Sequence, residues 1–334
     1  MRILGAACGR GERAYLNGAA MLKGTVANTD RGWFEFLRGR PDLEEVNFWS
    51  PSPRQAFRGD PHTPFFFRLK APVKAVAGFA TFTRYERLPP WLAWEAFGPG
   101  NGVDSLEELE SRLATLREHI RYRPPPGPDE IGCIMLLEPV LFPPDLWVPA
   151  PADWKPRTQS YRYYDLTVGE GRRLWDRCLG AARELSEARY DWTDRKWAER
   201  AERFGGPQMV RPRLGQGTFR IATMAAYERA CAVTGEHSLP ALDAAHIKPF
   251  ARGGEHEVAN GIFIRTDLHR LFDRGYLTVT PELRLVVGSR LRQDYENGRT
   301  YYPLAGTKLR LPRATEERPS AGHLRWHNES VFRG

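Results

Sequence analysis

The stretch that decides the fold begins with Leu242-Asp243-Ala244-Ala245-His246-Ile247-Lys248-Pro249. It continues through Asn260-Gly261 and ends with Leu268-His269-Arg270-Leu271-Phe272-Asp273. A histidine, an asparagine and a second histidine therefore follow one another at fixed spacing. We expect the first histidine on a strand, the second on the helix that follows, and the asparagine between them, where it fixes the loop.

These three residue types suit the hydrolysis of a phosphodiester bond, which needs a base to activate water and a divalent cation to take up charge on the phosphate. We expect His246 to be the general base, within hydrogen-bond reach of the attacking water. His269 is expected to bind the cation through a ring nitrogen. Asn260 is expected to hold the loop and so to orient His246.

The pattern extends on both sides of these residues. Cys231-Ala232-Val233-Thr234-Gly235 precedes His246, a Gly253-Gly254 turn precedes Asn260, and Phe272-Asp273-Arg274-Gly275 closes the helix. In this order the motifs resemble the HNH (ββα-metal) endonuclease family. The resemblance implies a DNA endonuclease that uses a divalent metal ion, Mg²⁺ or Mn²⁺ first of all. A fold of the same kind without catalysis is the alternative.

One position departs from that family pattern. Many HNH sites place an aspartate directly before the base histidine, where it is a second metal ligand, and this chain has Ala245 there. Asp243 lies two residues earlier on the strand, and Asp273 lies one helical turn after His269, on the same face. Both are candidate metal ligands, and both are equally open to a structural role.

Composition sets the broad class of the protein. The chain has 334 residues, of which 41% are hydrophobic and 12% aromatic, so it is long enough for two or three domains with a sizeable core. Its net charge of +8 favours a polyanionic partner, although many proteins are mildly basic. No run of about 18 apolar residues is present to span a bilayer.

The four cysteines also limit the class of protein that the chain can belong to. They are scattered, with no C-x-x-C pair, so we expect no structural zinc and interpret them as buried, reduced thiols of a cytoplasmic protein. They are Cys8, Cys133, Cys178 and Cys231.

The pattern of strands and helices predicts an α+β protein in three parts. Residues 1–155 contain short strands bent by Gly and Pro at 45–49, 64–69, 73–85 and 131–137, with helices near 33–37 and 106–120. Residues 156–205 carry a long, charged helical pattern that suits a solvated linker, with a basic face toward DNA as the alternative. Residues 206–334 hold the nuclease motif, and their first helix is expected from Ile221 to Ala230.

The first part resembles the PUA superfamily, which includes SRA and EVE modules. The resemblance rests on Val46-Asn47-Phe48-Trp49-Ser50-Pro51, Phe65-Phe66-Phe67-Arg68-Leu69-Lys70 and the region from Trp94 to Gly102. It implies a half-open β-barrel with a pocket in which a flipped, modified base stacks on aromatic side chains. The candidate pocket residues are Phe48, Trp49, Asn47, Trp33 and Trp94, and core packing is the competing interpretation for each aromatic residue.

A short basic segment enters the nuclease part and is interpreted as a loop that contacts DNA, with an ordinary turn as the alternative. The candidate DNA-binding residues are Arg211, Arg213, Gln216, Arg220 and Lys248. His256, in the loop between the motif residues, is interpreted as a solvated loop residue. His327 could approach the site from the carboxyl terminus.

Together these features predict a modification-dependent restriction endonuclease. The first part would recognise duplex DNA with a modified cytosine (5-methylcytosine or 5-hydroxymethylcytosine), and the nuclease part would cut nearby. Because one nuclease site cuts one strand, we expect a homodimer. A nicking or repair nuclease indifferent to modification, and a non-catalytic nucleic-acid binder, are the alternatives.

Overall fold

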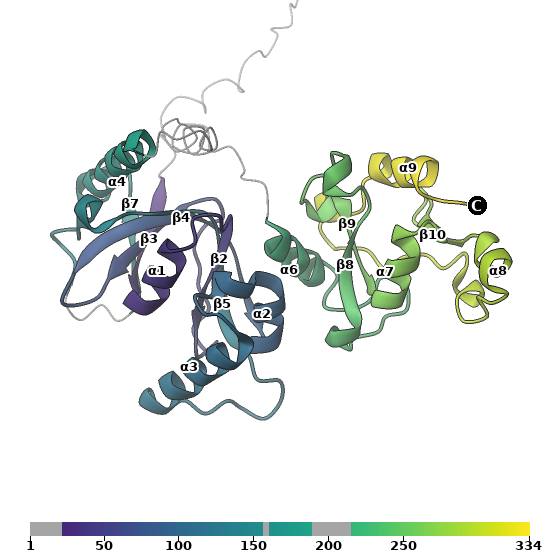
Figure 1. Ribbon diagram of the computed structural model, residues 1–334, viewed down its shortest axis with the longest axis horizontal. Coiled ribbons are helices and arrows are strands. Elements are labelled where there is room, and N and C mark those ends of the chain that lie inside the picture. Colours follow the sequence, from purple (N-terminus) through teal and green to yellow (C-terminus); the bar gives the residue numbers. More distant parts are fainter. Residues whose placement is uncertain (1–21, 156–159, 189–214) are drawn as a thin grey trace, which may run out of the picture.

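The computed structural model describes residues 22–155, 160–188 and 215–334. These residues form a mixed α+β structure with two lobes, one for each end of the chain (Figure 1). The predicted α+β class is therefore confirmed. Within the described residues, no helix has the length and apolar character needed to cross a bilayer.

The amino-terminal lobe is built on a seven-stranded sheet in the order β2-β5-β4-β3-β1-β7, with β6 paired to β4. Among the described strands of this sheet, β1 and β3 are the one parallel pair. β2 and β7 end the path without pairing to each other, which gives an open sheet. The strands are β1 (Lys23–Thr29), β2 (Glu45–Ser50), β3 (Pro64–Leu69), β4 (Ala75–Leu88), β5 (Ile131–Leu141), β6 (Val148–Pro149) and β7 (Tyr161–Asp165).

Helices cover the sheet and begin where their capping residues predict. Asp30 accepts a hydrogen bond from the backbone N–H of Trp33 and starts one helix, while Ser105 accepts from Glu108 N and starts another. These side chains satisfy backbone donors that the first helical turn leaves without partners. The helices of this lobe are α1 (Arg31–Arg38), α2 (Pro90–Phe97), α3 (Leu106–His119) and α4 (Gly169–Ala188).

Residues 161–188 belong to the amino-terminal lobe. β7 pairs antiparallel with β1, from Tyr161↔Ala27 to Asp165↔Lys23. α4 packs its apolar stripe on one face of the sheet, with Leu174, Trp175 and Cys178 buried. The predicted solvated linker is therefore wrong for residues 161–188, because every third or fourth residue of the helix is apolar and meets the sheet. The remainder of that segment lies outside the described residues.

The carboxy-terminal lobe is built around the antiparallel pair β8 (Leu242–His246) and β9 (Gly261–Arg265), with α7 (Thr266–Asp273) following directly. A second hairpin, β10 (Leu277–Val279) and β11 (Leu285–Val287), extends the lobe. α8 (Arg290–Tyr295) and α9 (Ala321–Ser330) complete it. Short 3₁₀ turns at Phe250–Arg252 and Val258–Asn260 shape the loop between β8 and β9.

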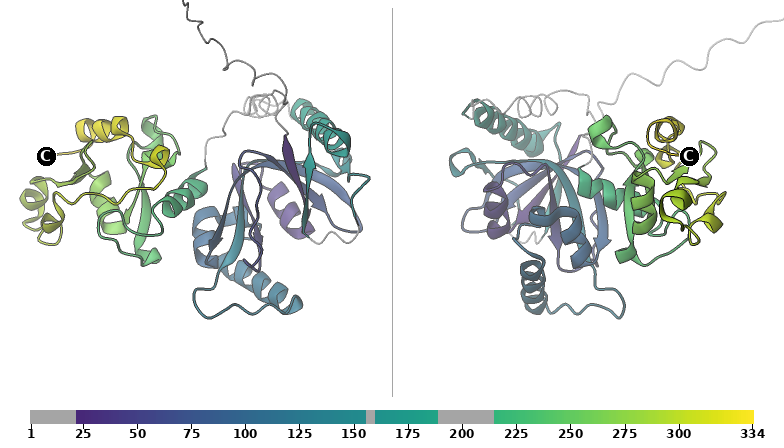
Figure 2. Two further views of the ribbon diagram at one scale, coloured as in Figure 1. Left: turned by 180° about the vertical axis from the view of Figure 1, so that it is seen from behind. Right: turned by 45° about the vertical axis from the view of Figure 1, so that its right-hand side comes forward.

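Helix α6 (Gln216–Ala226) lies between the two lobes in both views (Figure 1, Figure 2). Two glycines show how close the packing is. A Cβ at Gly217 would clash with Ala96 O of α2, and a Cβ at Gly261 would contact the Phe219 ring at 2.9 Å. One apolar core therefore runs from α2 and α3 through α6 into β8, β9 and α7. The two lobes share this core, and the amino-terminal lobe has two further apolar clusters of its own.

Candidate active site

The predicted nuclease motif folds as two strands and a helix. His246 is the last residue of β8 and pairs with Gly261 at the start of β9, and α7 follows β9 without a loop. His269, on α7, is near enough to His246 that its charge lowers the pKa of that ring. The structure thus brings both motif histidines to one place, as the sequence predicts.

Asn260 holds the loop that joins the two strands. Its side chain is fully buried. The Oδ1 atom accepts from Lys248 N at 2.9 Å, and Nδ2 donates to the carbonyl oxygens of Lys248 and Glu255 at 2.9 and 2.8 Å. Gly254 completes the turn, because a Cβ there would clash with Lys248 O. The amide therefore fixes the loop directly after His246.

His246 is a half-buried imidazole held between two aromatic rings. One face stacks on Phe219 of α6, with ring centroids 3.8 Å apart and planes 16° apart. Its Nε2 lies 3.0 Å from Nδ1 of His256. Burial, together with the charges of His256 and His269, lowers the pKa of His246 to about 4. The ring is therefore neutral at physiological pH, which is the form that a general base needs.

His269 lies between two carboxylates. Its Nδ1 is 3.1 Å from Asp243 Oδ2, and its Nε2 is 3.3 Å from Asp273 Oδ2. Burial lowers the pKa of His269, but the hydrogen bond to Asp243 and the charges of both aspartates outweigh it, and the net pKa is raised. The pKa of Asp273 is raised by burial and by the charge of Asp243.

The chemistry of this group suits a divalent cation, because imidazole nitrogen and carboxylate oxygen are common metal ligands. The two carboxylates contact opposite ring nitrogens of His269, whose lone pairs point apart. Among residues 22–155, 160–188 and 215–334, no three His, Cys, Asp or Glu side chains are arranged as one metal-binding group. His269 and one of its two aspartates are the residues that could hold such an ion.

Helix α6 links this group to the other lobe. Arg220 donates to Glu95 of α2 at 3.0 Å and lies 3.4 Å from Asp243 Oδ1. The Glu45 carboxylate, on β2, accepts from Gly217 N, Thr218 N and Thr218 Oγ1 at 2.7, 3.0 and 2.8 Å. The amino-terminal lobe therefore caps the helix that supports His246.

The predicted loop is wrong for residues 216–220, which lie in α6, a helix that begins five residues earlier than predicted, while their contact with DNA stays a prediction. Gln216 is exposed at the start of that helix. The Arg220 guanidinium is paired with the carboxylates of Glu95 and Asp243. Lys248 lies beside the site, with Nζ 5.7 Å from the centre of the Trp326 ring. Arg211 and Arg213 lie outside the described residues.

The predicted base-pocket residues divide between two faces of β2. Phe48 faces the core that contains Trp33, and their ring centroids are 5.3 Å apart. Asn47 faces the other way, where Nδ2 donates to Asn101 Oδ1. Trp49 donates to Asn101 O on the same side. Trp94, on α2, packs against that second core. The five residues therefore do not surround one cavity, because neighbouring residues of a strand point to opposite faces.

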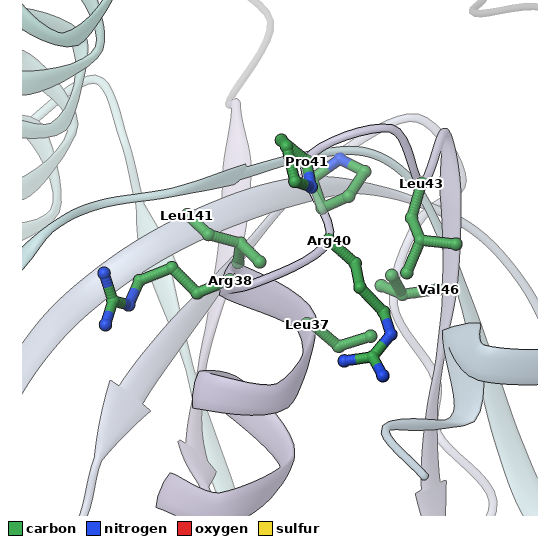
Figure 3. A pocket seen from close by; sticks show the side chains of 8 residues that line it. Leu37, Arg38, Arg40, Pro41, Leu43, Val46 and Leu141 are labelled. Carbon is green, nitrogen blue, oxygen red and sulfur yellow. The ribbon is translucent and has the colours of Figure 1, made fainter. Parts of the chain in front are cut away.

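A hollow lies elsewhere on this lobe, between the end of α1 and the start of β2 (Figure 3). Its cavity volume of about 20 Å³ suits one or two water molecules and is far too small for a nucleobase. Arg40, at its rim, donates to Asp104 and to Phe36 O. The lining residues are Leu37, Arg38, Arg40, Pro41, Leu43, Val46, Pro139 and Leu141.

Sequence reasoning missed three residues of the site. His256 was interpreted as a solvated loop residue, which is wrong, because its ring contacts His246. Phe219 and Glu45 had no local signal, since their partners lie far away in the sequence. For His256 a signal did exist, because the Gly253-Gly254 turn folds the chain back toward the strand end. His327 is buried against Phe272 and hydrogen-bonded to Thr278, and these contacts do not include either motif histidine.

Comparisons with known proteins bear on this geometry. The model of an HNH endonuclease family matches residues 231–280, so this part of the chain is an HNH endonuclease domain. Among solved structures, the chain is similar to ASCH from Zymomonas mobilis, with 16% identity and a TM-score of 0.31 over 46% of this chain and 94% of that one.

It is also similar to a modification-dependent TagI restriction endonuclease, with 12% identity and a TM-score of 0.28 over 86% of this chain and 75% of that one. No curated protein matches the chain.

Proposed function

We propose that the protein is a metal-dependent endonuclease that cuts duplex DNA near a modified cytosine. The observation that carries the nuclease part is a strand–strand–helix unit whose loop is fixed by Asn260, in which His269 is near enough to His246 for its charge to lower the pKa of that ring. The segment is also the one that matches an HNH endonuclease family. Net positive charge supports a polyanionic substrate.

In this proposal His246 takes the proton of the attacking water. His269 holds a divalent cation, Mg²⁺ or Mn²⁺, together with Asp243 or Asp273. When bound, such an ion stabilises negative charge on the phosphate and on the leaving oxygen. Asn260 keeps the loop after His246 closed, and Phe219 keeps the imidazole from rotating, so the base does not have to be ordered during the reaction.

The modified base would be recognised by the amino-terminal lobe. The support for this is the Phe48 ring, which packs beside two other aromatic rings and remains partly exposed. Phe48 lies 5.3 Å from Trp33 and 5.1 Å from Phe65, between centroids, and is only partly covered. A flipped base gains about 1–3 kcal/mol from stacking on such a ring. An HNH core makes few base contacts of its own, so selectivity is expected from the second lobe. A homodimer would supply the second site needed to cut both strands.

The first experiment tests the base. Replacing His246 by Ala should remove cleavage while leaving binding of duplex DNA within about twofold, because the ring acts in proton transfer and makes no required DNA contact. Cleavage would be followed on supercoiled plasmid with Mg²⁺ or Mn²⁺, and binding by gel shift. His237→Ala, which removes an exposed histidine nine residues before His246, is the control. Undiminished cutting by His246→Ala would contradict the assignment.

The second experiment tests selectivity. Matched plasmids with and without 5-methylcytosine or 5-hydroxymethylcytosine should be digested at different rates, with the modified plasmid preferred at least tenfold. Phe48→Leu should reduce that preference more than Trp49→Phe, because Trp49 faces away from the Phe48 surface. Equal digestion of all plasmids would favour a modification-independent nicking or repair nuclease. No digestion under any divalent metal would favour a non-catalytic binder.

A further inference from the structure

The second imidazole of the site, His256, is placed by its own set of contacts. Its ring stacks on Phe250, with centroids 4.8 Å apart and planes 11° apart. The residue before it, Glu255, is held through its carbonyl oxygen by Asn260 Nδ2 at 2.8 Å. Phe250 is itself 54% exposed, so its ring covers one face of His256 toward solvent. The position of the His256 side chain is therefore fixed by contacts within the loop.

In the contact between the His246 and His256 rings, one nitrogen donates a hydrogen bond and the other accepts it. His246 Nε2 and His256 Nδ1 are 3.0 Å apart, with the ring planes at 69°. A neutral imidazole has one N–H donor and one bare nitrogen, so one of these two nitrogens carries the shared proton. Burial lowers the pKa of both histidines, so both are neutral at physiological pH. Among the described residues, Nδ1 of His246 has no hydrogen-bond partner.

We propose that His256 is a positioning residue that sets the tautomer of His246. Its Nδ1 accepts the Nε2–H of His246, so that Nδ1 of His246 is the bare nitrogen that takes the proton of water. This inference rests on the proposed function, because the opposite tautomer would leave His246 with a protonated Nδ1 and no basic nitrogen free. Which nitrogen bears the proton is commonly fixed in this way by the bond that the other nitrogen makes.

The proton balance of the step is simple. One water O–H bond breaks, its proton bonds to Nδ1 of His246, and the hydroxide forms the new bond to phosphorus. The bond from phosphorus to the leaving oxygen breaks, and that oxygen keeps the electron pair and takes a proton from solvent, to which His246 afterwards returns its own. His246 becomes an imidazolium whose Nε2–H is still held by the neutral His256. That acceptor stabilises the cation as it forms, as hydrogen bonds to charged groups are stronger than neutral ones.

A metal ion shared by the two nitrogens is the competing account of their contact. Two nitrogen ligands at 2.0–2.1 Å from one tetrahedral ion would lie roughly 3.3 Å apart. The observed 3.0 Å suits a hydrogen bond better. Within the described parts of the chain, no third His, Cys, Asp or Glu completes a metal-binding group around this pair.

The test reads the tautomer directly. The full chain would be labelled with ¹⁵N-histidine, freed of metal with a chelator, and its ring nitrogens recorded by NMR, with His246→Ala identifying the resonances. The expected result is a protonated Nε2 and a bare Nδ1 on His246 without any metal. A protonated Nδ1, or a pattern that appears only when metal is restored, would overturn the inference.

Two kinds of variant extend the test to catalysis. His256→Phe keeps a ring on Phe250 but removes the acceptor, and it should lose the fixed tautomer. Its single-turnover rate at saturating DNA and metal should fall about 10- to 100-fold, the effect of removing a group that orients a functional histidine. DNA affinity should stay unchanged. His256→Asn or His256→Gln, whose amide oxygen can accept the same hydrogen bond, should recover most of the rate.

The outcomes separate this inference from the proposed function. If His256→Phe is folded and cuts at the rate of the unchanged protein, the positioning role is wrong while the nuclease assignment stands. If neither amide variant recovers any rate, packing of the ring and not its nitrogen is what matters, and the inference is again wrong. If His246→Ala still cuts, the proposed base itself is wrong.

Discussion

At the scale of single residues, burial decides what the motif histidines can do. His246 and His269 come from the same short motif, yet their pKa values move in opposite directions. Burial lowers the pKa of His246, which contacts no carboxylate of the described residues, whereas contact with Asp243 and Asp273 raises the pKa of His269. One ring is thus kept neutral as a base, whereas the other lies beside two carboxylates whose oxygens are themselves possible cation ligands.

The pKa of His246 predicts the acid limb of the reaction. The base works in its neutral form, and a pKa lowered to about 4 keeps that form at lower pH than an ordinary histidine would. The single-turnover rate at saturating metal and DNA should therefore show no break near pH 6.5 that arises from His246. Rates from pH 5 to 8.5, with metal affinity measured at each pH, would check this. A tenfold loss per unit that begins near pH 6.5 at saturating metal would contradict it.

At the scale of elements, helix α6 is the part on which both lobes depend. Its first turn has no capping side chain of its own, and the Glu45 carboxylate from β2 takes that place. An anionic group at a helix amino terminus is favourable because the backbone N–H groups there lack partners. The same helix carries Phe219, which stacks on His246, and Arg220, which reaches Asp243.

Removing the charge of Glu45 should therefore affect stability and cleavage together. Glu45→Gln leaves the shape but weakens three charge-assisted hydrogen bonds, which should cost about 1–3 kcal/mol of unfolding free energy. The cleavage rate should fall more than DNA affinity does, because Phe219 shifts with the helix. Glu95→Gln is the matched control, since its pair with Arg220 is half exposed and worth about 0–1 kcal/mol. Equal effects of the two variants on denaturant unfolding would contradict this role.

At the scale of the whole molecule, stability depends on a shared core and on buried polar groups within it. His327, on α9, is only 2% exposed and stacks on Phe272 with centroids 3.7 Å apart. Its Nδ1 is 2.8 Å from Thr278 Oγ1, and its Nε2 donates to Phe272 O at 3.2 Å. Burial lowers its pKa to about 4. The carboxyl-terminal helix is thus joined to the nuclease helix through a neutral imidazole.

His327 should make stability depend on pH. Between about pH 6.5 and 4 the unfolded chain binds a proton at this residue and the folded chain does not, so acidification favours unfolding. The loss should be about 1.4 kcal/mol per pH unit, up to about 3 kcal/mol in total. His327→Gln keeps a donor for Phe272 O but does not titrate. The free energy of unfolding in urea would be measured for both proteins from pH 7 to 4. Its dependence on pH should be smaller in the variant by the uptake of one proton, and identical slopes would refute the prediction.

The amino-acid sequence by itself determined the nuclease motif and most elements of the fold. The aromatic-rich runs of β2 and β3 and the helical spacing of residues 106–120 are local signals, and the elements that they predict are present. His246, Asn260 and His269 lie within 24 residues of one another, so the strand, turn and helix between them fix their arrangement. The sequence did not decide whether Asp243 contacts His269. The distance between these two side chains depends on the twist of the strand and not on the spacing of Asp243 from His246.

Only the tertiary structure decided which distant residues complete the site. Glu45 lies 172 residues from Gly217, and its cap exists because the two lobes share one core. Phe219 reaches His246 only because glycine at 261 lets α6 approach β9. Residues 161–188, which look solvated from their charges, join the first lobe because a free sheet edge and face accept them. Such contacts follow from packing in three dimensions, which no local pattern of residues encodes.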